Sequence, residues 1–373
     1  MRKLFVMTIF FIFLFSFSVK AYDISAQSVI LLDAHSGRAL FEKNSNHQLP
    51  MASTTKIMTG LLACESGKLG KTVKVSPFAA GAEGSSLWLK IGEKQTLENL
   101  TYGLMLKSGN DAAVAIAEYL GGSVEAFALL MNKKAREIGA VNTNFENPHG
   151  LDSENHYTTA YDLALIAREA MKNKLFSKIV ATRTYTIPNP NEKWGRALKN
   201  HNKLLWSFEG CRGVKTGYTK RCGRCLVSYA ERNGEELICV TLNAPDDWND
   251  HTYLLNYGFE NYNCKEVAKK NNTAYELIYD EENNRKVKLL YSKDCKIAIR
   301  NDEKVTTKIQ IDKLRIPSKK GTKAGKITVY CNNILIEEIP LVTASAVKKL
   351  TFLHRIKELL LSFLKMLSSI FSF

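Results

Sequence analysis

Three short motifs, far apart along the chain, constrain this sequence more than any other feature. Ser53 and Lys56 form a Ser-x-x-Lys pattern, Ser108 and Asn110 belong to Ser-Gly-Asn, and Lys215 opens Lys-Thr-Gly. Residues three apart share one face of a helix, so the Lys56 amine is expected within reach of the Ser53 hydroxyl. A serine beside a base is an activated nucleophile. Ser-x-x-Lys alone occurs often by chance, but the three motifs in this order indicate an enzyme that forms an acyl intermediate on serine.

The first two motifs supply residue types suited to proton transfer. Lys56 has to be neutral to accept the serine proton, and burial together with the charge of Lys215 is expected to lower its pKa. Ser108 can relay a proton to the departing amine. The amide of Asn110 can bind the substrate backbone and hold Lys56 in place.

The third motif suits recognition of a carboxylate. Lys215 offers a cation and Thr216 a hydroxyl donor, while Gly217 lets the strand approach a substrate closely. A lone lysine on a strand is usually a solvated surface group, and the two partner motifs reverse that interpretation here. The reaction needs no metal or other cofactor, and none is expected.

The N-terminus has the pattern of a secretory signal peptide over residues 1–21. Arg2 and Lys3 are basic, the segment 4–19 is apolar, and Val19-Lys20-Ala21 offers a small-residue cleavage site. An uncleaved anchor helix is the alternative, although the apolar run is short for a span. The formal charge of +15 favours anionic surfaces such as lipid head groups or acidic wall polymers. No segment resembles a nucleic-acid-binding module, and none is expected to bind nucleic acid.

The C-terminal segment 345–373 is strongly amphipathic. Its polar residues recur in steps of three and four, at Lys348, Thr351, Arg355, Glu358, Ser362, Lys365, Ser369 and Ser372. Its apolar residues cover the opposite face, at Leu350, Leu353, Ile356, Leu360, Phe363, Leu364, Leu367 and Phe371. This pattern predicts a helix that lies in a membrane interface. The alternative is a terminal helix packed on the protein or on a dimer partner.

Two folded domains are expected between these ends. Residues 22–262 alternate strand-like and helix-like segments, with hairpins at both ends, which predicts an α+β domain built on an antiparallel sheet. Helices are predicted over Ser53–Ser66, Leu97–Lys107, Asp111–Leu120, Val124–Ile138 and Thr159–Lys172, and strands over Ser28–Asp33, Arg38–Glu42, Cys225–Ala230 and Glu236–Leu242. Residues 265–343 consist of short alternating segments with Asn-Asn turns, which predicts a small all-β domain.

The chain resembles the low-molecular-mass penicillin-binding proteins of the D-alanyl-D-alanine carboxypeptidase family. The three motifs carry this resemblance, together with Asn147–Asp152 and His156–Ala160. Ile316–Gly321 and Gly325–Ile327 resemble the β domain that follows in the family. The resemblance implies a β-lactamase/transpeptidase-like catalytic domain, a small β domain and an amphipathic C-terminal helix.

The resemblance also implies a reaction. The enzyme is expected to remove the terminal D-alanine from peptidoglycan stem pentapeptides through an acyl-enzyme on Ser53, and to bind β-lactam antibiotics covalently. The oxyanion is implied to rest on the amides of Ser53 and Tyr218. The enzyme is expected to be secreted across the cytoplasmic membrane and attached peripherally to its outer face through the C-terminal helix.

Two other functions share some of these sequence features. A β-lactamase of similar fold is disfavoured by Ser-Gly-Asn at Ser108, by the β domain and by the tail. A non-catalytic wall-binding protein is disfavoured because Ser53, Lys56, Ser108 and Lys215 are all intact.

The sequence departs from the family pattern at Tyr218 and at the Cys222/Cys225 pair, and it leaves more than one role open for the histidines His149 and His156. Some relatives carry histidine after Lys-Thr-Gly where this chain has Tyr218, so the backbone donor is kept there while the histidine side chain is not. Cys222 and Cys225 are compatible with structural thiols, with a disulfide or redox-sensitive pair, or with a metal site. His149 and His156 suit hydrogen bonding within a loop, and a metal pair or a base is the alternative.

Overall fold

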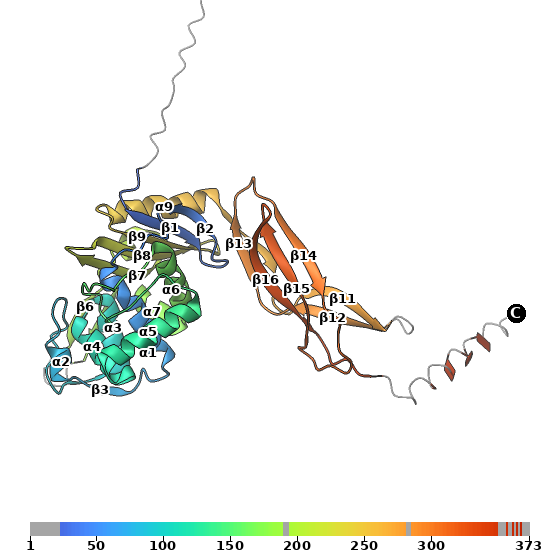
Figure 1. Ribbon diagram of the computed structural model, residues 1–373, viewed down its shortest axis with the longest axis horizontal. Helices are drawn as coiled ribbons and strands as arrows, with labels where there is room; N and C mark the ends of the chain where they lie inside the picture. The colour runs from blue at the N-terminus through green and yellow to red at the C-terminus, as the bar shows by residue number, and fades with distance from the viewer. Residues whose placement is uncertain are drawn as a thin grey trace, which may run out of the picture.

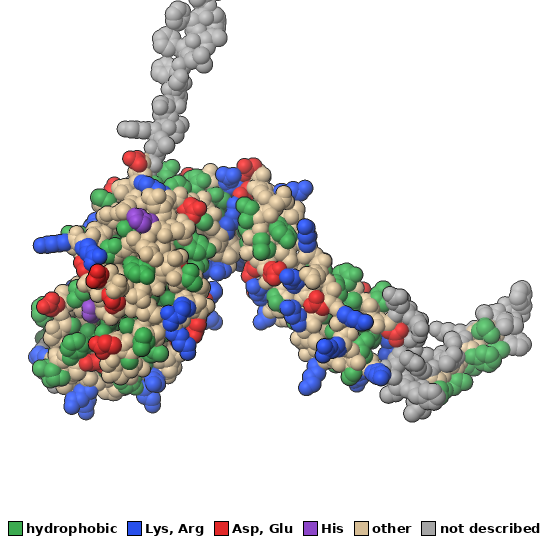
Figure 2. Space-filling view, in the orientation of Figure 1, with side chains coloured by type: hydrophobic (Ala, Val, Ile, Leu, Met, Phe, Trp, Pro, Cys, Tyr) green, Lys and Arg blue, Asp and Glu red, His purple; other side chains and the backbone are tan. Residues whose placement is uncertain are grey.

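The computed structural model describes residues 23–188, 194–280 and 285–349, together with 356, 360, 361, 363, 364, 366 and 367. The predicted signal peptide over 1–21 and the turn at Asn283-Asn284 lie outside these residues. The remainder forms two lobes joined at one end (Figure 2).

The first lobe is built on a five-stranded antiparallel sheet with the order β2-β1-β9-β8-β7. Its strands are β1 (Ser28–Asp33), β2 (Ala39–Lys43), β7 (Cys211–Thr219), β8 (Gly223–Arg232) and β9 (Glu235–Leu242). The β8–β9 turn has φ values of 51° at Asn233 and 79° at Gly234, the left-handed conformations that a tight hairpin requires. Strand β7 lies at one edge of the sheet and carries Lys-Thr-Gly.

Helices cover both faces of this sheet (Figure 1). On one face lie α9 (Asp247–Asn261) and the short α8 (Leu204–Ser207), and the other helices lie on the opposite side around a second apolar core. These are the short helix η1 (Ala52–Thr55), α1 (Lys56–Glu65), α2 (Pro77–Ala80), α3 (Leu97–Leu106), α4 (Asn110–Gly121), α5 (Val124–Ile138), α6 (Ala160–Lys172) and α7 (Lys174–Ala181). The α+β prediction is therefore confirmed. The predicted helix at Ser53 differs in detail, because it opens with a 3-10 turn.

Two small two-stranded sheets complete the first lobe. They pair β3 (Thr72–Lys74) with β4 (Lys94–Thr96), and β5 (Thr184–Ile187) with β6 (Arg196–Lys199). Helix α9 was not predicted from the sequence. It buries polar side chains, including Asp250 and His251, so it has no continuous apolar stripe.

The second lobe is all-β, as predicted. One sheet has the order β11-β12-β16-β15-β14 and a second pairs β10 with β13. The strands are β10 (Asn263–Ala268), β11 (Thr273–Asp280), β12 (Arg285–Tyr291), β13 (Cys295–Ile299), β14 (Val305–Ile311), β15 (Lys323–Cys331) and β16 (Ile334–Thr343).

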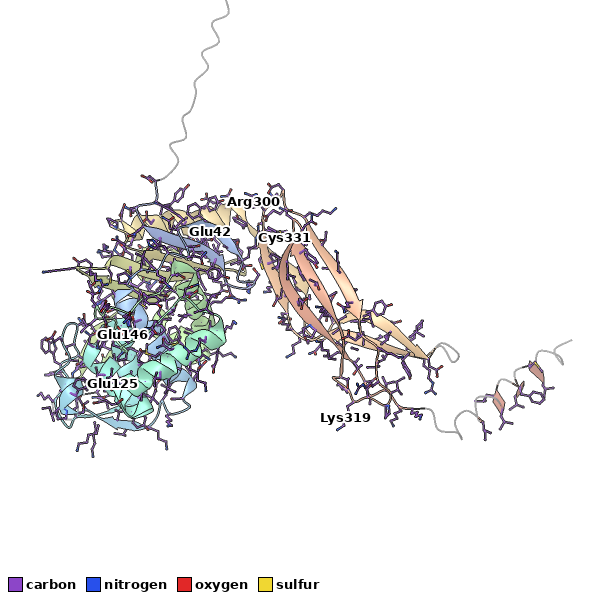
Figure 3. The ribbon with its side chains drawn as sticks, in the orientation of Figure 1. Glu42, Glu125, Glu146, Arg300, Lys319 and Cys331 are labelled. Carbon is purple, nitrogen blue, oxygen red and sulfur yellow. The ribbon has the colours of Figure 1, made fainter. Side chains whose placement is uncertain are left out.

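Polar contacts fix the junction between the lobes. Arg38 forms an ion pair with Glu303 and donates to the carbonyl of Ala298 at 2.9 Å. The Asp33 carboxylate accepts the backbone N–H of Ala298 at 2.9 Å. Figure 3 shows Cys331 at this junction and Lys319 at the opposite end of the β domain, where the chain leads into its tail.

The tail begins later than the sequence pattern predicted. Residues 345–349 are not helical, because Val347 is buried and forms a β-bridge with Ser318. The described positions between 356 and 367 have helical backbone, and Ile356, Leu360, Leu361, Phe363, Leu364 and Met366 are exposed. Among the described helices, none alone has the length and apolar composition to cross a bilayer; α4 and α5 meet those criteria only jointly, across an 82° bend.

Candidate active site

Ser53 lies in the 3-10 turn that precedes α1. The turn is held by side-chain bonds from Thr54 Oγ1 to the Met51 carbonyl and from Thr55 Oγ1 to the Ala52 carbonyl, at 2.5 and 2.9 Å. Ala52 has φ of 46°, an uncommon left-handed conformation for a residue other than glycine. The local fold thus presents Ser53 from a strained, doubly braced turn.

Lys56 is fully buried beneath the nucleophile. Its Nζ lies 2.9 Å from Ser53 Oγ, 2.7 Å from Asn110 Oδ1 and 2.6 Å from the His149 carbonyl oxygen. Burial lowers the pKa of Lys56 well below its usual value, and the positive charge of Lys215 lowers it further. Both effects favour the neutral amine.

The three partners of Lys56 also determine where its lone pair points. An ammonium donates three hydrogen bonds, whereas a neutral amine donates two and accepts one. The amide oxygen of Asn110 and the carbonyl of His149 can only accept. The Ser53 hydroxyl alone among the three can reverse and donate. The neutral amine is therefore directed to receive its hydrogen bond from Ser53.

The Ser-Gly-Asn motif lies where a loop meets the start of α4. Ser108 is nearly buried and has φ of 62°. The Asn110 N–H donates to the Ser85 carbonyl at 2.7 Å, and its side-chain amide donates to the Glu83 carbonyl. The second contact fixes the amide so that its oxygen faces Lys56.

The Lys-Thr-Gly strand closes the other side of the site. Lys215 is buried, its Nζ donates to the Thr216 carbonyl at 2.8 Å, and burial lowers its pKa to about 7. A Cβ added to Gly217 would lie 3.0 Å from the backbone nitrogen of Ser53, so glycine permits this approach of β7 to the nucleophile. The side chain of Tyr218 is 66 % exposed.

These residues surround a cavity of about 360 Å³. Its lining consists of Ser53, Ser85, Ser108, Thr216, Gly217 and Tyr218, together with His201, Lys203, Arg224, Asp247 and Trp248. The structure therefore brings the three motifs to one site. The catalytic and binding roles of these residues stay predictions.

Both histidines of the neighbouring loops have structural contacts. His156 accepts the Glu146 N–H at Nδ1 and contacts Thr55 Oγ1 at 2.8 Å through Nε2, while His149 accepts the Leu151 N–H. Burial is the main cause that lowers the pKa of His149 to about 3 and that of His156 to about 4. Neutral rings with these partners fit the loop role favoured by the sequence.

The two cysteines near β7 are free thiols. Cys222 contacts Thr219 Oγ1 at 2.9 Å and lies 3.6 Å from Asp152 Oδ1. Its hydrogen bond with Cys225 lowers the pKa of Cys222 and raises that of Cys225. Within the described residues, no group of three or more His, Cys, Asp or Glu side chains is placed to hold a metal ion.

Sequence reasoning missed three supporting groups. The carbonyls of Glu83 and His149 orient Asn110 and Lys56, and backbone atoms leave no residue-type signal. Asp111 is fully buried and accepts the N–H groups of Leu87 and Leu89. The sequence did offer one sign of the role of Asp111, because an acidic residue stands there in the first turn of the otherwise apolar helix α4.

Comparison with known families agrees with this geometry. A family model described as "D-alanyl-D-alanine carboxypeptidase" matches residues 16–246, and "Penicillin-binding protein 5, C-terminal domain" matches residues 262–349. The chain belongs to the D-alanyl-D-alanine carboxypeptidase family. The family prediction is thereby confirmed, as is the assignment to the hydrolases.

Individual relatives resemble the chain over most of its length. D-alanyl-D-alanine carboxypeptidase DacF of Bacillus subtilis is 35 % identical, covering 88 % of each chain. DacA of Escherichia coli K12 is 31 % identical over 90 % of this chain and 86 % of its own. The structure of penicillin-binding protein 5 from Haemophilus influenzae matches with a TM-score of 0.74 and 29 % identity, covering 89 % of this chain and all of that one. Membership in the carboxypeptidase family therefore extends through both lobes.

Proposed function

We propose that this carboxypeptidase removes the terminal D-alanine from peptidoglycan stem pentapeptides through an acyl-enzyme on Ser53, and that β-lactams acylate the same serine. One observation carries the proposal. Lys56 is buried against Ser53, and the serine hydroxyl is the one partner that can donate a proton to it.

The proposed reaction begins when Ser53 Oγ attacks the carbonyl between the two D-alanines. Lys56 accepts the hydroxyl proton as the bond forms. The negative charge develops on the former carbonyl oxygen, for which the family resemblance supplies the N–H groups of Ser53 and Tyr218. The tetrahedral intermediate then expels the D-alanine amine, which receives a proton through Ser108. Water hydrolyses the ester and regenerates the serine.

Lys215 and Thr216 explain why the enzyme is proposed to prefer substrates with a free terminal carboxylate. Lys215 is buried, and the next residue, Thr216, lines the cavity, so a carboxylate bound beside Thr216 would compensate the charge of a buried cation. A second carboxyl-containing substrate class, the β-lactams, presents the same charge next to a reactive carbonyl.

One experiment tests this function. The enzyme is incubated with a labelled penicillin and, separately, with a peptide ending in D-Ala-D-Ala. Stable labelling with release of D-alanine is expected. Rapid loss of label without D-alanine release would indicate a β-lactamase. If the protein neither binds the label nor releases D-alanine, the result would indicate a non-catalytic wall-binding protein.

The pH dependence of carboxylate recognition is expected to follow Lys215. In the free enzyme, Lys215 loses its charge as pH rises through about 7. At pH 6, a substrate with a free terminal carboxylate should therefore exceed its amide in kcat/KM by on the order of 100-fold. Above pH 7 this ratio should fall by about tenfold per pH unit, because only the protonated lysine favours the acid.

The ratio of the two substrates isolates this effect. Deprotonation of Lys56 changes turnover of acid and amide alike, so it cancels. Lys215→Met should give a low ratio that does not vary with pH. A pH-independent ratio in the unmodified enzyme would contradict the assigned role of Lys215.

We further propose that the enzyme is exported through the 1–21 signal peptide and held at the outer face of the cytoplasmic membrane by its tail. The amphipathic pattern of 350–373 supports attachment, and so do the exposed apolar side chains of its described positions. The far end of the β domain, near Lys319, gives rise to this tail (Figure 3). The β domain then acts as a spacer.

Removing the tail is expected to release the enzyme from membranes. The cut belongs after Lys349, because Val347 is part of the β domain. The truncated enzyme should keep its activity on small peptides and stop floating with anionic liposomes. As a matched pair, Leu364→Glu should weaken flotation far more than Ser362→Glu, since both add one negative charge but only Leu364 lies on the apolar face. Equal flotation of full-length and truncated protein would place the attachment elsewhere.

A further inference from the structure

A loop with an exposed tryptophan borders the catalytic cavity. Ser85 lines the cavity, and its carbonyl accepts the N–H of Asn110. Three residues further on, Trp88 is 81 % exposed. The steps of the proposed reaction use neither this ring nor the loop that carries it.

The loop is fixed to the catalytic motif by buried contacts. The Asp111 carboxylate accepts Ser86 Oγ at 2.8 Å, the Leu87 N–H at 2.9 Å and the Leu89 N–H at 3.1 Å. A Cβ at Gly109 would lie 2.9 Å from Leu87 Cγ, so the Leu87 side chain lies directly against the Ser-Gly-Asn motif. Consecutive Cα atoms are about 3.8 Å apart, which places the Trp88 backbone immediately beside this contact.

The backbone of Trp88 is held in an unfavourable conformation. Its φ is 59°, which is rare for a bulky residue. Its N–H donates to Ser86 Oγ at 2.8 Å, and its carbonyl accepts from Arg196 at 3.3 Å. Burial of the ring does not explain this conformation, because the ring is exposed. Strain that neighbours maintain around an exposed side chain is typical of binding sites.

A second exposed ring stands on the adjoining hairpin. Trp194 is 75 % exposed and lies two residues before Arg196 at the start of β6. Arg196 binds Glu93 through both terminal nitrogens, at 2.6 and 2.8 Å, and the same guanidinium contacts the Trp88 carbonyl. The side chain of Glu93 is only 1 % exposed. A partly buried ion pair therefore joins the two tryptophan-bearing segments into one rim.

We propose that Trp88 and Trp194 form a saccharide subsite, which binds the glycan that carries the stem peptide. This inference rests on the proposed function, because it takes the substrate to be a peptide attached to a sugar. Four residues of extended peptide span about 14 Å at most, so that sugar must bind near the rim of the cavity around Ser53. A tryptophan face covers the C–H face of a sugar ring while the hydroxyl groups stay in water, which suits exposed rings.

The position of the rim favours a sugar over a lipid surface. The loop of Trp88 continues from a residue that lines the catalytic cavity, and the tail that carries the apolar membrane face leaves from the far end of the other lobe. A lipid-binding role for Trp88 is a separate outcome of the test.

The test compares two substrates that share one pentapeptide. One has an acetylated N-terminus and the other carries the N-acetylglucosamine–N-acetylmuramic acid disaccharide. Trp88→Asn removes the ring and suits the left-handed backbone. This variant should lower the ratio of kcat/KM, disaccharide substrate over free peptide, by about fivefold to tenfold, the size of one aromatic contact. Trp88→Tyr should retain most of the ratio, and Leu129→Ala, an exposed position on α5, should not change it.

Binding is measured independently of turnover by titrating chitotetraose against tryptophan fluorescence. The unmodified enzyme should respond, and Trp88→Asn should respond less. If the unmodified enzyme hydrolyses neither substrate, the proposed function fails while this titration still decides the subsite. An unchanged ratio, an equal loss on both substrates, or loss of anionic-vesicle binding with the ratio intact would each overturn the subsite.

Discussion

Replacing Ser53 with alanine is expected to abolish both D-alanine release and penicillin labelling. Removing the nucleophile leaves Lys56 without an acid to deprotonate, and the loss in rate should be about 10⁴-fold or more. The surrounding turn should survive, because its bracing bonds come from Thr54 and Thr55. Mass spectrometry of the protein after incubation with penicillin provides the measurement.

A matched substitution on the same helix controls for effects on folding. Ser66 lies at the other end of α1, where its hydroxyl donates to the Ala63 carbonyl, and Ser66→Ala removes that hydroxyl. Ser66→Ala should acylate as fast as the unmodified enzyme. A covalent penicillin adduct on Ser53→Ala would move the nucleophile to another residue.

Lys56→Arg is expected to lose about 10²- to 10⁴-fold in acylation rate, the usual contribution of a general base. Arginine keeps the positive charge but stays protonated at accessible pH, so it cannot take the proton from Ser53. Raising the pH should therefore not restore activity. The measurement is the second-order rate constant of penicillin acylation between pH 6 and 10.

Arginine is also larger than lysine, and Lys56 is fully buried, so Lys56→Arg could disturb the fold as well as remove the base. The melting temperature of Lys56→Arg separates misfolding from loss of the base. Lys68→Arg, an exposed lysine just beyond the same helix, should change neither quantity. A folded Lys56→Arg enzyme with most of its acylation rate would make Lys56 an electrostatic group and place the base elsewhere.

Features with local causes could be predicted from the sequence. The β8–β9 hairpin follows from Asn233 and Gly234, whose left-handed conformations a tight turn needs. The order of the three motifs predicted one shared site, and the structure assembles it. Helix α9 could not be predicted in this way, because it buries polar groups such as His251, which contacts Ser228 and Thr241.

Long-range and backbone contacts had no signal in the sequence. The carbonyl of His149 completes the Lys56 environment although 93 positions separate them. Arg38 joins the lobes by pairing with Glu303, 265 positions away. The start of the tail was predicted too early, since amphipathic periodicity does not reveal that Val347 pairs with Ser318.

The position of β7 at the edge of its sheet has a consequence for how broadly the enzyme can act. An edge strand leaves backbone N–H and C=O groups without partners, and an extended peptide can pair with them as an additional strand. Such pairing uses atoms that every residue possesses. A stem peptide could then change its third residue without losing these bonds. The enzyme is expected to discriminate by charge at the chain end, and to tolerate walls that differ in the composition of the peptide before it.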